Sequence, residues 1–346
     1  MTGQALGVQG GDHRGRATVR LDLSTCVNPY GPPPAVMARI RRADEGTVRR
    51  HPYEATAVVE QAYACYLGLP AQQLVAISGT SEMIWLLARE FRGRRVGLPL
   101  PTYTEFRRAF ADAVVYGGGP STHSIAELDT AMSANDAVVF ANPHNPTGQV
   151  IDRAELLDLA ARYPSTTLVV DESYLDFLPE GAAATLVGCP ADNMIVLRSP
   201  SKFFGLAGLR SGVAWSRLAL PAEVEAWRSP WPISAVAAEA VAVALQDEGW
   251  ASATRQRLTD DAVWLDENLA DTSLVVAPGQ LHFRLVTGAA RRLATFAEVL
   301  ETHGIAVRVL GDGHGVGTPA ARIASPAEPD RALLRAALRD LAGSRQ

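Results

Sequence analysis

The chain has 346 residues, of which 47% are hydrophobic and 20% charged, and its formal net charge is −5. The length allows two domains, because single hydrophobic cores rarely grow past roughly 250–300 residues. The slightly acidic balance argues against nucleic acid or an anionic membrane surface as a partner.

We predict an N-terminal arm over residues 1–45 that contributes to a smaller domain. Its start is polar and glycine-rich with no apolar core, so we expect no secretory signal and a cytoplasmic protein. A short extended piece is expected at 18–23, and a proline-rich turn, NPYGPPP, at 28–34. Helical periodicity begins at Ala35.

Strand-like and helix-like segments alternate between residues 79 and 209. The segment SGTSEMIWLLAREF predicts a helix, because a Gly-Thr-Ser turn opens it. Short strands are predicted for RVGLPLPTY, AVVFANP, TLVVDESY and NMIVLRSP. Strands separated by helices predict a mostly parallel sheet covered on both faces, in a large α/β domain over residues 46–228. Ligands bind such sheets at the carboxyl ends of the strands.

The pattern changes after Pro230, and we predict a smaller α+β domain over residues 229–346. Helices are expected at 234–251, 255–269 and 330–342, and strands in LHFRLV, GIAVRVL and AARIAS. The longest apolar stretch, at 232–245, is too short to cross a bilayer. The three cysteines are far apart and the seven histidines are scattered, so we expect neither a disulfide framework nor a bound metal.

The sequence contains 32 lysine and arginine residues, of which only Lys202 is a lysine. Codon bias toward arginine explains the loss of surface lysines. It would not remove a lysine whose amine must lose its proton and form a covalent bond, because a guanidinium cannot do this. Lys202 is therefore a candidate for covalent chemistry.

The neighbours of Lys202 suit a phosphate ester beside an aldehyde. In SPSKFFGLAGLRSG the lysine follows a predicted strand, is flanked by Ser199 and Ser201, and precedes Arg210. Arginine offers a bidentate fork to phosphate, the two hydroxyl groups add donors, and the amine forms the covalent link.

Other segments add groups that suit the rest of such a cofactor. Asp171, at the end of a buried strand, would keep a pyridine nitrogen protonated. Tyr174 and Asn145 could donate hydrogen bonds to a phenolate oxygen on the ring, and Tyr103 could stack on it. The helix that begins in SGTSEM offers free N–H groups to phosphate.

Together these segments resemble the fold type I pyridoxal-phosphate-dependent aminotransferases, most nearly the branch of histidinol-phosphate aminotransferases and threonine-phosphate decarboxylases. The shared elements are N-P-x-G-P at 28–32, HPYEA at 51–55, N-P-x-N-P-T-G at 142–148, D-E-x-Y at 171–174 and S-K-x-x-x-L-x-G-L-R-x-G at 201–212. The resemblance implies an aspartate-aminotransferase-like large domain and a smaller α+β domain. The sequence departs from the family at His144, where Asn, Ser or Gly is commoner.

The resemblance also implies residue roles. Lys202 would carry pyridoxal 5'-phosphate and shuttle the Cα proton, while Arg322 would grip the substrate carboxylate. Tyr53 would reach the phosphate of the other subunit, which implies a homodimer. The phosphate would be held by Thr80, Ser81, Ser199, Ser201 and Arg210. Asn28 and Tyr30, in a segment that lines the pocket in relatives, are candidate substrate contacts.

Two classes of reaction remain open. The first is transfer of an amino group between an amino acid and a 2-oxo acid. The second is lyase chemistry on the same scaffold, namely decarboxylation, elimination, or cyclisation of a guanidino amino acid as in capreomycidine-type synthases. A regulator of this fold is disfavoured, because the chain has no extra length for a DNA-binding domain.

Overall fold

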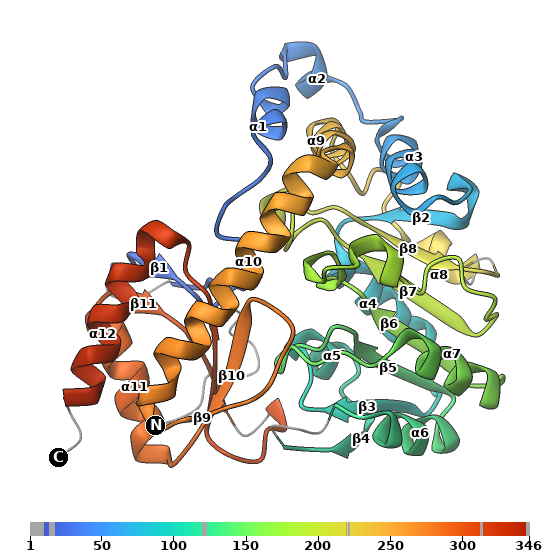
Figure 1. Cartoon of the computed structure of the whole chain (residues 1–346). Coiled ribbons are helices and arrows are strands. Elements are labelled where there is room, and N and C mark those ends of the chain that lie inside the picture. Colours follow the sequence, from blue (N-terminus) through green and yellow to red (C-terminus); the bar gives the residue numbers. More distant parts are fainter. Residues whose placement is uncertain are drawn as a thin grey trace.

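The computed structural model describes residues 10–13, 18–119, 123–218, 220, 222–311 and 314–343. Residues 1–9 and 14–17 of the predicted arm lie outside this description. Two bodies of secondary structure are seen side by side, linked by one long helix (Figure 1).

A seven-stranded sheet forms the centre of the larger body (Figure 1). In spatial order its strands are β2 (Leu74–Ile77), β8 (Gly212–Ser216), β7 (Met194–Arg198), β6 (Thr167–Asp171), β5 (Ala137–Ala141), β3 (Val96–Leu100) and β4 (Val114–Gly117). Only β8 runs antiparallel to its neighbours. The mostly parallel central sheet predicted from the sequence is confirmed.

Helices cover both faces of this sheet. One face packs against α3 (Ala55–Leu67), α6 (Ile125–Ala134) and α7 (Arg153–Arg162), and the other against α4 (Thr80–Glu90), α5 (Thr104–Ala109) and α8 (Ala222–Trp227). The alternation of strand side chains explains the two layers. In β5, Val138 and Phe140 join the first core, whereas Val139 and Ala141 join the second.

The smaller body contains two short sheets. Four antiparallel strands have the order β12 (Arg308–Leu310), β13 (Ala320–Ala324), β10 (Phe283–Thr287) and β9 (Val275–Val276). The N-terminal strand β1 (Leu21–Asp22) pairs in parallel with β11 (Ile305–Ala306). Helices α11 (Ala290–Thr302) and α12 (Arg331–Gly343) belong to this body. The division of the chain at residues 45 and 228 stays a prediction.

The predicted break between the helices near residue 250 was wrong. The sequence suggested helices at 234–251 and 255–269, but the chain forms α9 (Ala235–Gln246) and then α10 (Glu248–Leu269). The two helices are separated at Asp247, whose backbone is not helical (φ −88°, ψ 70°). Its carboxylate caps the start of α10 by accepting a hydrogen bond from Trp250 N at 3.0 Å. Helix α9 packs against α3, and α10 then runs to the smaller body (Figure 1).

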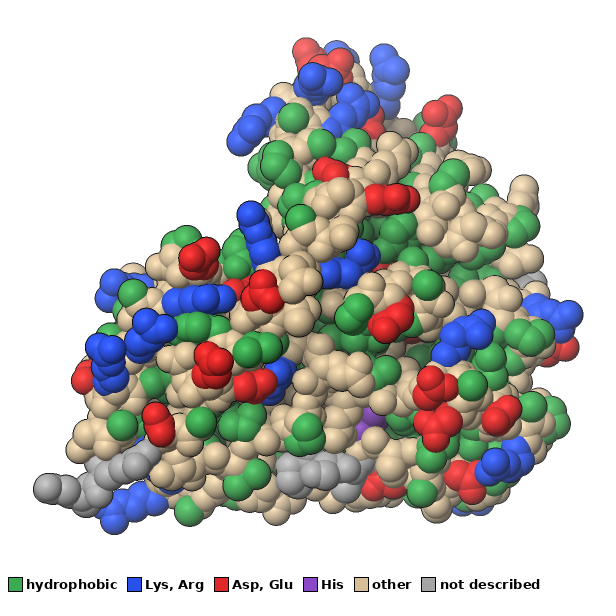
Figure 2. All heavy atoms as spheres, viewed as in Figure 1, with side chains coloured by type: hydrophobic (Ala, Val, Ile, Leu, Met, Phe, Trp, Pro, Cys, Tyr) green, Lys and Arg blue, Asp and Glu red, His purple; other side chains and the backbone are tan. Residues whose placement is uncertain are grey.

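The remaining elements are short. Helices α1 (Pro34–Ile40) and α2 (Glu45–Arg49) lead into the large sheet. The 3₁₀ turns are η1 (Ala71–Gln73), η2 (Leu175–Phe177), η3 (Gly181–Ala184), η4 (Ala207–Leu209), η5 (Ala270–Thr272) and η7 (Glu328–Asp330). Acidic and basic side chains lie next to one another over much of the face in Figure 2. Within the described ranges, no helix has the length and apolarity that a membrane span requires.

Candidate active site

A cavity of about 410 Å³ lies where the carboxyl ends of β5, β6 and β7 meet the smaller body. Its walls are formed by Gly10, Thr25, Thr80, Ser81, Tyr103, Glu105, Arg108, Ala141, Asn145, Asp171, Ser173, Tyr174, Lys202, Arg210 and Arg322. Most of the residues predicted to hold a cofactor therefore line one cavity, although they come from distant parts of the chain. The parallel strands explain this convergence, because their carboxyl ends share one edge of the sheet.

Lys202 follows β7 and points its amine at the cavity wall opposite. Its Nζ donates a hydrogen bond to the Thr25 carbonyl at 2.9 Å. Burial lowers the pKa of Lys202 to about 8; the nearby Cys26 thiol opposes this shift, and the positive charges of Arg322 and Arg210 add to it. A lysine with this pKa is partly neutral near physiological pH, and only the neutral amine is a nucleophile.

Asp171, the last residue of β6, is buried and faces the same cavity. Its Oδ1 accepts hydrogen bonds from Ser173 N at 2.9 Å and Ser173 Oγ at 2.5 Å. Burial raises the pKa of Asp171, and the Ser173 bonds and the Lys202 charge oppose that shift. A protonated pyridine nitrogen would satisfy this carboxylate, so Asp171 fits the predicted ring partner.

The end of the cavity where the sequence predicts phosphate binding is formed by the start of α4 and by Arg210. Gly79 precedes α4 with φ 78°, and a Cβ at this glycine would lie 2.5 Å from Nη2 of Arg210. The guanidinium therefore sits directly on the helix N-terminus, beside Thr80 and Ser81. Helix N–H groups together with a guanidinium are the donors that a phosphate monoester requires, so this end of the cavity fits pyridoxal 5'-phosphate.

Ser199 and Ser201, predicted phosphate donors, are buried and lie next to the cavity rather than among its lining residues. Their hydroxyl oxygens are 2.8 Å apart, and Ser201 N donates to Ser199 Oγ at 3.2 Å. Ser211 Oγ is also buried and has no hydrogen-bond partner in the described part of the chain. A role for Ser199 and Ser201 on phosphate stays a prediction.

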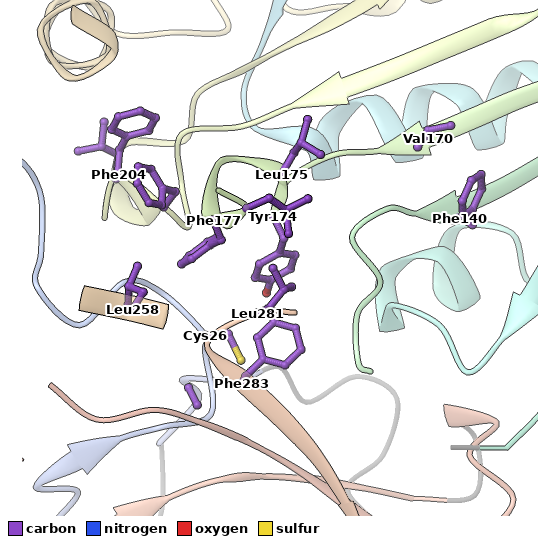
Figure 3. Packing of buried hydrophobic residues seen from close by; sticks show 14 of the residues in the cluster. Cys26, Phe140, Val170, Tyr174, Leu175, Phe177, Phe204, Leu258, Leu281 and Phe283 are labelled. Carbon is purple, nitrogen blue, oxygen red and sulfur yellow. The ribbon is translucent and has the colours of Figure 1, made fainter. Parts of the chain in front are cut away.

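Tyr103, Asn145 and Tyr174 surround the position predicted for the ring. Asn145 accepts a hydrogen bond from Nη1 of Arg322, which leaves its amide N–H groups to donate toward the cavity. Tyr174 is 4% exposed, and its ring meets Phe283 of the smaller body edge-on at 5.3 Å. Figure 3 shows Tyr174 and Phe283 beside Cys26, where the two bodies of the molecule join.

Arg322, on β13, is 7% exposed and projects into the cavity from the smaller body. Nη2 donates to the Ser24 carbonyl at 2.5 Å, while Nε is buried without a hydrogen-bond partner among the described residues. An unsatisfied buried guanidinium N–H is costly, and a carboxylate or phosphate would satisfy it.

Sequence reasoning missed a second arginine at this wall. Arg308, on β12, is 4% exposed and is the direct cross-strand partner of Arg322. Both line a small adjoining cavity of about 30 Å³, together with Thr102, Thr104 and His314. A buried charge inside the apolar strand GIAVRVL was the signal available in the sequence.

Asn28 and Tyr30, predicted substrate contacts, lie outside the cavity lining and bond to protein groups. Asn28 N donates to the Lys202 carbonyl at 3.0 Å, and its Nδ2 donates to the Phe203 carbonyl at 2.8 Å. Tyr30 donates its hydroxyl proton to Asp261 at 2.8 Å. In this arrangement Asn28 supports the loop that carries Lys202, and a substrate contact by either residue stays a prediction.

Tyr53 lies away from the cavity of its own chain. It is 73% exposed and packs edge-on against Trp231, with ring centroids 5.8 Å apart. This position is compatible with a role in a second subunit and leaves that role untested.

Six residues of the cavity lining were not predicted, namely Gly10, Thr25, Glu105, Arg108, Ala141 and Ser173. The Thr25 carbonyl accepts a hydrogen bond from Lys202, and Ser173 donates two hydrogen bonds to Asp171. Glu105 and Arg108 form an ion pair at 2.7 Å on the wall beside Tyr103. Only their closeness in sequence to predicted site residues could have suggested them.

The chain resembles known proteins over nearly its whole length. Residues 18–341 match the family model of aminotransferase class I and II. The chain is 30% identical to histidinol-phosphate aminotransferase 2 of Burkholderia mallei, with 83% of each protein covered. It is also 30% identical to threonine-phosphate decarboxylase of Salmonella typhimurium, with 96% of each covered.

A solved structure shares the fold. Histidinol-phosphate aminotransferase from Sinorhizobium meliloti, in complex with pyridoxal-5'-phosphate, superposes with a TM-score of 0.83 at 23% identity, covering 95% of this chain and 92% of that one. The aspartate-aminotransferase-like architecture predicted from the sequence is thereby confirmed.

Proposed function

The chain belongs to the aminotransferase class I and II family of pyridoxal-phosphate-dependent enzymes, and from this premise we propose that it transfers an amino group between an amino acid and a 2-oxo acid. The observation that carries the proposal is the cavity in which the amine of Lys202, the carboxylate of Asp171 and the guanidinium of Arg322 converge. Lys202 would carry the cofactor and move the Cα proton, and Arg322 would hold the substrate carboxylate.

The cofactor, when bound, supplies an aldehyde for the amine and a ring that withdraws electrons from the substrate. Side chains and backbone groups of the protein bind the cofactor and move the proton. Asp171 would keep the ring nitrogen protonated, Asn145 and Tyr174 would donate to the ring oxygen, and Tyr103 would pack on the ring face. Arg210 and the N-terminus of α4 would hold the phosphate. Lys202 would take the Cα proton, and its lowered pKa of about 8 suits this role because part of the amine is neutral near pH 7.

We also propose that the substrate carries a second anionic group, such as a phosphate ester. The pair Arg308 and Arg322 supports this, because the two residues are direct cross-strand partners and line one small cavity beside the main one, where both guanidinium groups can donate to an anion. The two relatives named above act on phosphorylated compounds, which agrees with such a site. The same two guanidinium groups would repel a guanidino substrate, which argues against cyclisation of a guanidino amino acid.

Decarboxylation is the second candidate reaction, and the arginine pair is also the observation that favours it. If both arginines hold the phosphate ester, neither is left for the α-carboxylate. That carboxylate could then lie across the ring plane and depart as carbon dioxide. If Arg322 holds the carboxylate and Arg308 the phosphate, the Cα proton is the group that leaves.

An assay with O-phosphothreonine separates transamination from decarboxylation. The purified, cofactor-loaded protein is incubated with O-phosphothreonine and 2-oxoglutarate, while glutamate and carbon dioxide are measured. We expect glutamate and no carbon dioxide. Carbon dioxide from O-phosphothreonine without glutamate would replace transamination by decarboxylation. Equal rates with threonine and O-phosphothreonine would contradict the anionic-substrate proposal.

We propose in addition that the enzyme is a cytoplasmic homodimer in which Tyr53 reaches the site of the other subunit. The exposed position of Tyr53 supports this arrangement. No nucleic acid or membrane partner is proposed.

A further inference from the structure

His144 lies in the NPHNPTG loop and is 2% exposed. Its Nε2 is 2.8 Å from the Pro101 carbonyl, and its Nδ1 is 2.7 Å from Thr147 Oγ1. Its backbone is paired too, since His144 N donates to the Gln149 carbonyl and Gly148 N donates to the His144 carbonyl, both at 2.8 Å. Every polar group of this residue is therefore used within the protein.

These partners determine the tautomer of the imidazole. A carbonyl oxygen only accepts, so Nε2 carries the proton and donates to Pro101. Nδ1 is then the acceptor, and the Thr147 hydroxyl donates to it. Burial holds the pKa of His144 well below its usual range, which keeps this neutral form.

A second histidine covers the ring of His144. The imidazole of His123 stacks on it with centroids 4.0 Å apart and planes 9° apart. His123 Nε2 lies 3.5 Å from Asn142 Oδ1, on the same loop. The stack covers one face of the His144 ring and so restricts how the imidazole can turn.

The two segments bridged by His144 carry two of the cavity residues. Pro101 stands two residues before Tyr103, and Asn145 directly follows His144. Both Tyr103 and Asn145 line the cavity, and Asn145 is bonded in turn to Arg322. The imidazole is thus the direct link between the end of β3 and the loop after β5.

We propose that His144 is a positioning residue that sets the separation between Tyr103 and Asn145 across the cofactor ring, acting as its Nε2–H tautomer. The inference rests on one part of the proposed function, namely that pyridoxal phosphate binds between the side chains of Tyr103 and Asn145.

Two variants test the two hydrogen bonds of the imidazole separately, because each variant can keep only one of them. In His144→Asn the amide reaches only the place of Nδ1, so the Thr147 contact is kept and the Pro101 bond is lost. In His144→Gln the amide nitrogen reaches the place of Nε2 and can donate to Pro101. The readouts are the dissociation constant of pyridoxal phosphate and the visible circular dichroism per bound cofactor, which reports how the ring is held.

We expect His144→Asn to weaken cofactor binding about tenfold, as the loss of one buried hydrogen bond implies, and to reduce the dichroism. His144→Gln should restore both toward the wild type. Unchanged dichroism in His144→Asn, with only a lower melting temperature, would overturn the proposal. If His144→Asn does not fold, His144→Gln decides instead: it keeps the donor to Pro101, so a dichroism and a dissociation constant far from those of the wild type would overturn the proposal.

Separate measurements test this inference and the proposed function, so the failure of one can be distinguished from the failure of the other. A wild type that binds the cofactor but catalyses neither transamination nor decarboxylation contradicts the proposed function, while the dichroism comparison still decides the role of His144.

Discussion

Arg308 and Arg322 face each other in direct register across the antiparallel strands β12 and β13. Both are buried, and Arg322 bridges the smaller body to Asn145 of the larger one. In the proposed function these two guanidinium groups hold the anionic groups of the substrate, and the way they divide those groups would determine which Cα bond breaks.

Arg308→Met and Arg322→Met test this division. If Arg322 holds the carboxylate, Arg308→Met should raise KM roughly tenfold or more for a phosphorylated substrate only, while Arg322→Met should raise it for phosphorylated and unphosphorylated substrates alike, as the loss of a charged hydrogen bond implies. Steady-state kinetics with O-phosphothreonine and threonine make the comparison. Equal, phosphate-selective losses in both variants would instead place both arginines on the phosphate.

The pKa of Lys202 predicts the pH dependence of cofactor capture. A pKa of about 8 leaves about a tenth of the amine neutral at pH 7, far more than the ordinary lysine pKa would. The rate at which the apoenzyme gains visible absorbance from added pyridoxal phosphate should rise as pH increases toward 8 and level off above it. An inflection near 10.5 would show that burial does not shift this amine.

Gly79→Ala should disturb the phosphate end of the site. The added Cβ would lie 2.5 Å from Nη2 of Arg210, and the backbone has φ +78°. We expect a stability loss of about 1 kcal/mol from the backbone and about a tenfold weaker affinity for pyridoxal phosphate from the displaced guanidinium.

Gly93→Ala is the matched control for that variant. Gly93 has φ +80° with nothing within 4 Å of the added Cβ, so it should show the backbone cost alone. A similar affinity loss in both variants would refute the contact between Gly79 and Arg210 as the cause.

The dimer proposal predicts complementation between subunits. Tyr53→Ala and Lys202→Ala should each have low activity, but a mixed dimer contains one site with both native side chains. Mixing the two variants after mild dissociation should therefore restore activity, measured by the amino-transfer assay. Tyr53 is 73% exposed, so its removal should leave the melting temperature of the chain nearly unchanged. Mixtures no more active than their components would count against a shared site.

The partly buried His123 predicts acid sensitivity. Burial lowers the pKa of His123 to about 4, below the unfolded value of 6.5, so the unfolded chain binds more protons between these values. The free energy of unfolding should fall as pH decreases through this window. His123→Asn should remove about 2–3 kcal/mol of the difference between pH 7.5 and pH 4.5, measured by urea unfolding. Parallel pH profiles for variant and wild type would contradict the shift.

Local chemistry made much of the site predictable. Lys202, Asp171 and Arg210 each stand at the end of an apolar strand or in a glycine-rich turn, where a reactive or charged side chain has no role in packing. Parallel strands present such ends on one edge, so residues far apart in the sequence were expected to meet, and the cavity contains them.

The sequence by itself determined the type of sheet and the cofactor, and it singled out the lysine proposed to carry that cofactor, because apolar periodicity, turn residues and short motifs act over a few neighbouring positions. The tertiary structure decided the pairing of Arg308 with Arg322, the Thr25 carbonyl that meets Lys202, and the bridge made by His144. It also placed the helix break at Asp247, where a side-chain cap outweighs an apolar pattern that continues past it. Strand register, burial and close contacts between distant segments depend on how the whole chain packs, and no pattern within a short window of sequence specifies them.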